Sequence, residues 1–107
     1  MRKPLLSVKI KNAFRKTDIG ERLEIDLKNV IINHEKKGCS GFITYPGNNA
    51  CVYINTDCQT CTKHIMYRYA ENENDFTGGT NRWCNTIDEL VESVMGMLTT
   101  EPSGRRW

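Results

Sequence analysis

The chain of 107 residues has 38% hydrophobic and 26% charged residues and a formal net charge of +2, which excludes a disordered, fibrous or two-core protein. No apolar run approaches the roughly 20 residues of a membrane-spanning helix. The N-terminal apolar run ends at Lys9, before it reaches the length of a signal-peptide core. We therefore expect a single cytoplasmic domain without a membrane segment, whose five cysteines are free thiols or metal ligands rather than disulfides.

The N-terminal part of the chain predicts helices. Over residues 5–14 the apolar side chains follow helical spacing, and we favour a helix although the first few residues also fit strand alternation. A longer amphipathic helix is predicted over 18–37, with a capping-box pattern at Asp18 and Glu21 and an end before Gly38. Its apolar stripe consists of Ile19, Leu23, Leu27, Val30, Ile31 and His34.

The middle of the chain predicts three short strands. Residues 42–45 and 51–55 are β-prone runs, and the turn-forming residues 46–49 between them indicate a hairpin. The third run, 64–69, alternates in polarity, so that one face meets the helices while the other is more polar. The face expected to meet the helices carries Ile65, Tyr67 and Tyr69.

The last third predicts a long loop followed by a helix. Residues 71–85 are polar and rich in glycine, which is typical of a loop that carries function. Thr86 and Glu89 form a second capping-box pattern. The helix that follows has an apolar stripe of Ile87, Leu90, Val91, Val94 and Leu98.

These elements predict an α+β domain over residues 1–98 and a flexible C-terminal tail over 99–107. We expect a three-stranded antiparallel sheet with the helices packed on one face, in the order α-(α)-β-β-β-α. The opposite face has no predicted cover, which antiparallel sheets tolerate.

Nucleic-acid binding is one hypothesis for the function. The order helix, strand, strand, strand, helix resembles that of double-stranded-RNA-binding domains, which clamp phosphates with lysines at the start of their last helix. The matching stretch here, residues 85–89, is acidic and repels phosphates. The candidate phosphate contacts are instead the basic residues that give the first 16 residues a charge of +6, namely Arg2, Lys3, Lys9, Lys11, Arg15 and Lys16.

A structural zinc site is another hypothesis, and zinc is the only cofactor that the sequence suggests. Cys58, Cys61 and His64 follow a C-x2-C-x2-H spacing, and Cys84 is a candidate fourth ligand. No second C-x2-C pair or H-x3-5-H pair is present to complete the usual pattern. The alternative is that these cysteines bind no metal and are free thiols, buried or half-buried as cysteine commonly is.

A protein-binding module is the preferred hypothesis. The common catalytic, phosphate-loop and dinucleotide motifs are all missing, so we do not expect an enzyme. In size and in its lack of such motifs the chain is similar to small accessory and inhibitor proteins of phages, plasmids and conjugative elements, which implies a larger host protein as partner. The candidate anchors are Tyr45, Arg82 and Trp83, because aromatic and arginine side chains dominate interfaces.

Overall fold

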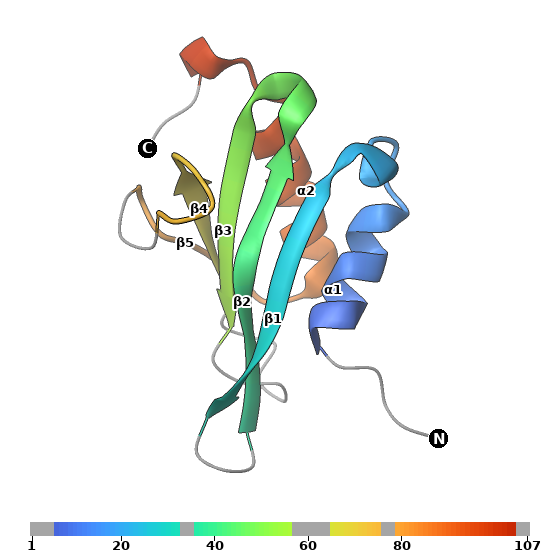
Figure 1. The fold of residues 1–107 in the computed structure, drawn as a ribbon, viewed down its shortest axis with the longest axis vertical. Coiled ribbons are helices and arrows are strands. Elements are labelled where there is room, and N and C mark those ends of the chain that lie inside the picture. The colour runs from blue at the N-terminus through green and yellow to red at the C-terminus, as the bar shows by residue number, and fades with distance from the viewer. Residues whose placement is uncertain (1–5, 33–35, 57–64, 76–78, 105–107) are drawn as a thin grey trace.

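The computed structural model describes residues 6–32, 36–56, 65–75 and 79–104. Its centre is one antiparallel sheet whose strands lie in chain order: β1 (Glu24–Ile32), β2 (Lys36–Tyr45), β3 (Ala50–Thr56), β4 (Ile65–Ala70) and β5 (Arg82–Cys84). The helices α1 (Leu6–Arg15) and α2 (Ile87–Thr99) cover the same face of this sheet (Figure 1). The class is α+β, but the sheet has five strands, so the prediction of a three-stranded sheet is wrong. No helix within the described ranges is long and apolar enough to cross a bilayer.

The largest error of the sequence reading lies at residues 18–37. They were expected to form one amphipathic helix, whereas the structure has a 3-10 turn at Gly20–Arg22, then β1, and then the beginning of β2 at Lys36. Once Ile25 is counted, Leu23, Ile25 and Leu27 are two residues apart, which is the strand period. Gly38 consequently lies inside β2, opposite Val30, and does not end a helix.

Four other predicted elements are confirmed. The N-terminal helix forms as α1, the hairpin forms as β2 and β3, and the third run forms as β4. The last helix forms as α2, whose Thr86 hydroxyl accepts a hydrogen bond from the Glu89 backbone N–H at 3.1 Å. This is the N-cap contact that the capping-box pattern predicts. The predicted loop 71–85 is wrong at one point, because it contains the edge strand β5.

The main core fills the space between the helices and the sheet. From the sheet it takes residues of β2 to β5 that face the helices, including Ile65, Tyr67 and Tyr69 as predicted. From the helices it takes apolar residues that are less than one-tenth exposed, namely Leu6, Ile10, Phe14, Leu90, Val94, Met97 and Leu98. A second, smaller cluster lies on the other face of the sheet and consists of Phe42, Cys51, Tyr53 and Ala70, with Met66 packed against it.

The turn between β2 and β3 is tied to the end of α2. The Asn48 side-chain amide donates hydrogen bonds to the carbonyl oxygens of Leu98 at 2.9 Å and Thr100 at 2.7 Å. Carbonyl groups at a helix C-terminus have no partner within the helix, so this side chain satisfies two groups that would otherwise need water. The contact fixes the end of α2 against the end of the sheet.

Candidate functional site

The candidate site is the sheet face opposite the helices, which we call the open face. Antiparallel register aligns its side chains in rows across the strands, because directly paired residues point to the same side. The upper row is Glu24, Thr44, Cys51 and Ala70, and the middle row is Asp26, Phe42, Tyr53 and Arg68. The lower row is Lys28, Ser40, Asn55, Met66 and Trp83.

Arg68 organises the middle of the open face. Its guanidinium carbon lies 4.7 Å from the centre of the Tyr53 ring, and the residue is only 1% exposed. One guanidinium nitrogen donates to the Tyr69 carbonyl at 3.2 Å and the other to the Asp75 carbonyl at 2.6 Å. The Asp75 carboxylate lies 3.7 Å from the first of these nitrogens. A buried charge is tolerated only when it is paired and hydrogen-bonded in this way.

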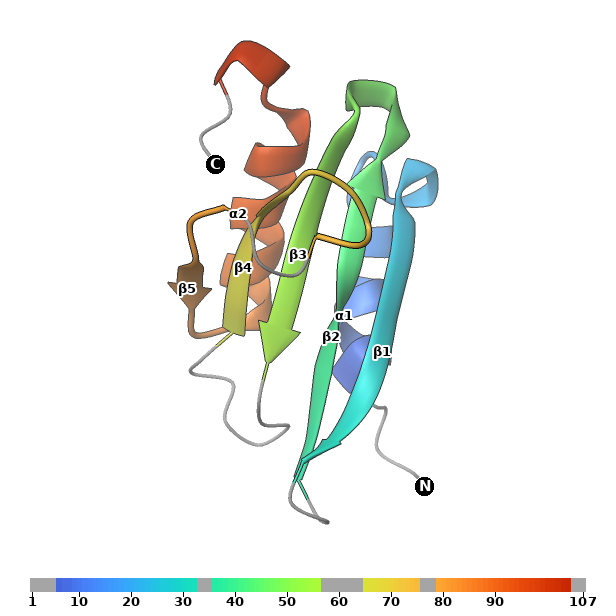
Figure 2. The same ribbon diagram turned by 60° about the vertical axis from the view of Figure 1, so that its left-hand side comes forward.

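The contacts of Arg68 hold residues 71–75 over part of the open face. Figure 2 shows the segment that leaves β4 crossing in front of β3. A second contact comes from the Thr44 hydroxyl, which donates to the Glu73 carboxylate at 3.4 Å. The upper and middle rows are therefore partly covered, which sequence reasoning missed because it treated this segment as an open loop.

Two shallow hollows flank the covering segment, and both are acidic. One, of about 180 Å³, is lined by Asp26, Lys28 and Glu73 among others, and the second, of about 190 Å³, by Glu71 and Glu73. Glu24 extends the same charge along β1, where it is exposed. Because Arg68 is buried and paired with Asp75, Lys28 is the one exposed cation of the three rows. This side of the molecule is thus suited to a positively charged partner.

The lower row contains the most exposed aromatic side chain of the described residues. Trp83 is 59% exposed on β5, directly opposite the half-buried Met66 of β4. Among the residues that the structure describes, the only other large hydrophobic side chain exposed to a comparable degree is Val8 on α1, at 41%. Trp83 and Met66 together form a small apolar patch at the β5 edge of the open face, next to Asn55.

The three predicted anchors do not form one surface. Trp83 and Arg82 are consecutive in β5 and therefore point to opposite faces of the sheet. The Arg82 guanidinium lies on the helix side, 5.4 Å from the centre of the Tyr69 ring. Tyr45, at the end of β2, is half-buried against the main core. Of the three, Trp83 alone belongs to the open face, and sequence reasoning missed Met66, which lies directly opposite Trp83.

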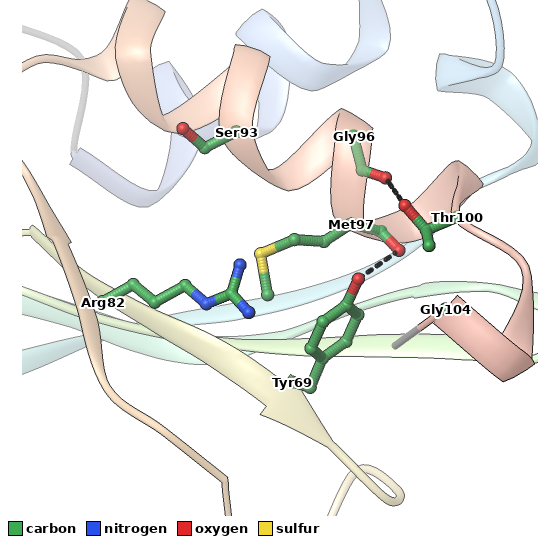
Figure 3. A pocket seen from close by; sticks show the side chains of 7 residues that line it. All are labelled: Tyr69, Arg82, Ser93, Gly96, Met97, Thr100 and Gly104. Carbon is green, nitrogen blue, oxygen red and sulfur yellow. Dashed lines mark hydrogen bonds between the residues drawn. The ribbon is translucent and has the colours of Figure 1, made fainter. Parts of the chain in front are cut away.

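Arg82 lines a pocket of about 380 Å³ between α2 and the strands β4 and β5 (Figure 3). Its polar groups are largely engaged within the protein: the Tyr69 hydroxyl donates to the Met97 carbonyl at 3.1 Å, and the Thr100 hydroxyl donates to the Gly96 carbonyl. The described lining offers a serine hydroxyl, Ser93, but no histidine or carboxylate to act as its base.

The described cysteines are buried thiols. Burial raises the pKa of Cys39 and of Cys84 to about 11. The Cys84 thiol donates to the carbonyl oxygens of Ile65 at 3.8 Å and Thr86 at 3.7 Å, as a protonated group does. Within the described ranges no three metal-binding side chains gather. Cys58, Cys61 and His64 lie outside those ranges, so the zinc hypothesis stays a prediction.

The basic residues proposed for nucleic acid divide into two kinds. Lys9, Lys11 and Lys16 are exposed on or just after α1, on the helix side of the sheet. Arg15 has a structural task, because one guanidinium nitrogen donates to the carbonyls of Gly20 at 2.6 Å and Leu23 at 2.8 Å, which fixes the turn into β1. Two further candidates, Arg2 and Lys3, lie outside the described residues.

Comparison with known proteins gives no family for this chain. No protein-family model matches it, and neither a curated protein nor a solved structure matches it significantly.

Proposed function

We propose that this chain is a non-enzymatic protein-binding module and that the open face is its binding surface. The observation that carries the proposal is Trp83, a large aromatic side chain 59% exposed on a sheet edge beside Met66. Tryptophan is enriched among residues that dominate binding energy, and methionine adapts to irregular apolar partners. Truncating such an anchor costs about 2 kcal/mol or more of binding free energy.

The charge on the rest of the open face, away from Trp83, indicates the kind of partner. Glu24, Glu71 and Glu73 are exposed on or beside the open face, whereas Lys28 is the single exposed cation of its upper, middle and lower rows. A partner that presents lysine or arginine around an apolar pocket fits this surface, and a phosphate backbone is repelled by it. That the partner is a larger host protein, and the chain an accessory or inhibitor protein of a phage or mobile element, belongs to the same proposal.

The test compares two truncations of exposed apolar residues. Tagged wild type, Trp83→Ala and Val8→Ala are used to capture proteins from the native host under identical conditions. Proteins recovered with wild type and with Val8→Ala but lost with Trp83→Ala identify the partner. Replacing Glu71 and Glu73 by glutamine should weaken the same association and reduce its salt dependence. If Trp83→Ala retains every protein that wild type captures, the open face is not the binding surface.

A second candidate function is nucleic-acid binding through α1, favoured by the three exposed lysines at positions 9, 11 and 16. This function predicts an affinity that falls steeply with salt and falls further when these lysines are replaced by glutamine. Arg15→Gln is unsuitable as a test because that side chain holds the turn at Gly20. An electrophoretic shift that is absent, or unchanged between low and high salt, rules the function out.

A further inference from the structure

β1 is the long outer edge of the sheet. It has nine residues and pairs with β2 on one side, and no other strand of the described residues pairs with its second side. Figure 2 shows it at the margin of the sheet with α1 behind it. The opposite margin, β5, has only three residues. An edge strand presents N–H and C=O groups that can pair with another strand, so β1 is the more extensive template of the two.

The charges of β1 are available for such pairing. Asp26 and Lys28 are both exposed on the open face, and neither forms an ion pair with another described residue. On the helix side of the same strand, Ile25 and Leu27 are only partly buried at the margin of the main core. A second strand laid along β1 would therefore meet opposite charges on one face and apolar side chains on the other.

The order of these residues makes β1 complementary to itself in one register. When two identical strands pair antiparallel about a twofold axis, the axis passes midway between the two copies of one residue, and the residues on either side of it face each other across the axis. An axis at Leu27 places each Asp26 opposite the Lys28 of the other copy, and places the two Leu27 side chains face to face. Opposite charges in directly facing positions stabilise a strand pair.

Each neighbouring register brings like charges together or leaves Asp26 and Lys28 without a charged partner. An axis at Asp26 sets each Lys28 opposite Glu24 of the other copy but also brings the two Asp26 carboxylates together, and an axis at Lys28 brings the two ammonium groups together. An axis at Ile25 places Glu24 against Asp26, and one at Asn29 gives neither Asp26 nor Lys28 a charged partner. Like charges in facing positions destabilise a pair, so charge selects the register centred on Leu27.

We propose that two copies of this chain associate through β1, antiparallel, with Leu27 on the twofold axis. The two sheets then form one continuous sheet, and all helices lie on the same side of it. The open face and Trp83 remain uncovered, so this association is independent of the proposed partner binding.

The first test is a charge exchange monitored by sedimentation velocity over a range of concentrations. Wild type should dimerise reversibly. Asp26→Lys alone and Lys28→Asp alone should each raise the dimer dissociation constant roughly ten- to hundredfold, because two facing pairs change from attraction to repulsion. The double variant, Asp26→Lys with Lys28→Asp, should restore dimerisation. Both side chains are exposed, so far-ultraviolet circular dichroism should stay the same in all three variants.

The second test reports the register directly. Facing residues of an antiparallel pair lie close enough for a disulfide, so Leu27→Cys should cross-link to itself under mild oxidation. Ile25→Cys is the matched control and should not, because it faces Asn29 of the other copy. Peptide mapping separates this bond from any formed by the native cysteines.

Several outcomes overturn the proposal. These are a wild type that stays monomeric at the highest concentration reached, a double charge variant that fails to regain dimerisation, or a preference for the Ile25→Cys cross-link. A dimer that is abolished by Trp83→Ala but insensitive to the charge exchange would place the contact on the open face instead. Loss of host-protein capture by Trp83→Ala leaves this proposal untouched, so the two proposals fail separately.

Discussion

Replacing Arg68 by methionine should release residues 71–75 from the open face. Methionine keeps most of the apolar volume but removes the donors to the Tyr69 and Asp75 carbonyls and the charge near Asp75. Hydrogen bonds from charged donors contribute about 1.5–3 kcal/mol each, and removing one partner of a buried ion pair costs about 3–5 kcal/mol. We expect the free energy of unfolding to fall by about 3 kcal/mol, since methionine recovers some apolar contact.

The measurement is urea denaturation, with hydrogen exchange of residues 71–75 followed at the same time. A loss of this size lowers the melting temperature of a small domain by on the order of 10–20 °C. Asp75→Asn is the matched control: it keeps the backbone carbonyl acceptor and alters only the carboxylate contacts, to Arg68 at 3.7 Å and to the Glu71 N–H at 3.1 Å, so it should cost about 1 kcal/mol or less. If Arg68→Met unfolds at the same urea concentration as wild type and its 71–75 amides exchange no faster, the covering role assigned to Arg68 is wrong.

Three further predictions concern other parts of the fold. Gly41→Ala should lower the free energy of unfolding by about 2 kcal/mol or more in urea titrations, because a Cβ at this position would lie 1.9 Å from the Asp26 carbonyl oxygen. Asn48→Ala should cost about 1–2 kcal/mol through its two lost carbonyl contacts, whereas Asn12→Ala, an exposed control on α1, should cost little. The free energy of unfolding should fall as pH rises from 9 toward 11. The reason is that Cys39 has a pKa of about 11 in the folded chain and stays protonated, whereas the thiol of the unfolded chain has a pKa of 9.0 and ionises. Cys39→Ala should reduce this dependence of the free energy of unfolding on pH.

Local patterns were sufficient for elements that local contacts stabilise. α2 was predictable because its cap, Thr86 with Glu89, and its apolar stripe all lie within the helix itself. The hairpin was predictable because Pro46 and the residues after it determine the turn. For β4, alternation also identified the side chains that face the helices.

Elements that depend on distant partners were not predictable. β1 is a strand because β2 pairs with it along its length, whereas residue spacing alone favoured a helix over residues 18–37, which was wrong. β5 has three residues within a polar segment and is defined only by its pairing with β4. The prediction of Arg82 and Trp83 as anchors on one surface was wrong in part for the same reason. Because residues 82 and 83 form a strand, their side chains point to opposite faces of the sheet, and only Trp83 lies on the open face. Residues 71–75 cover part of that face because Arg68 holds them there. The alternating sequence of β4 had indicated instead that the Arg68 side chain faces solvent.

The strand order, in which each strand pairs with the next one along the chain, bears on how the protein is made. Such a sheet closes only short loops as it forms, so its strands can pair progressively during synthesis. The inner side of that sheet, however, receives Leu90, Val94 and Leu98 only when the final helix has been translated. A chain terminated before residue 87 would leave uncovered the part of the apolar side that α2 covers, and would be a target for aggregation and chaperones.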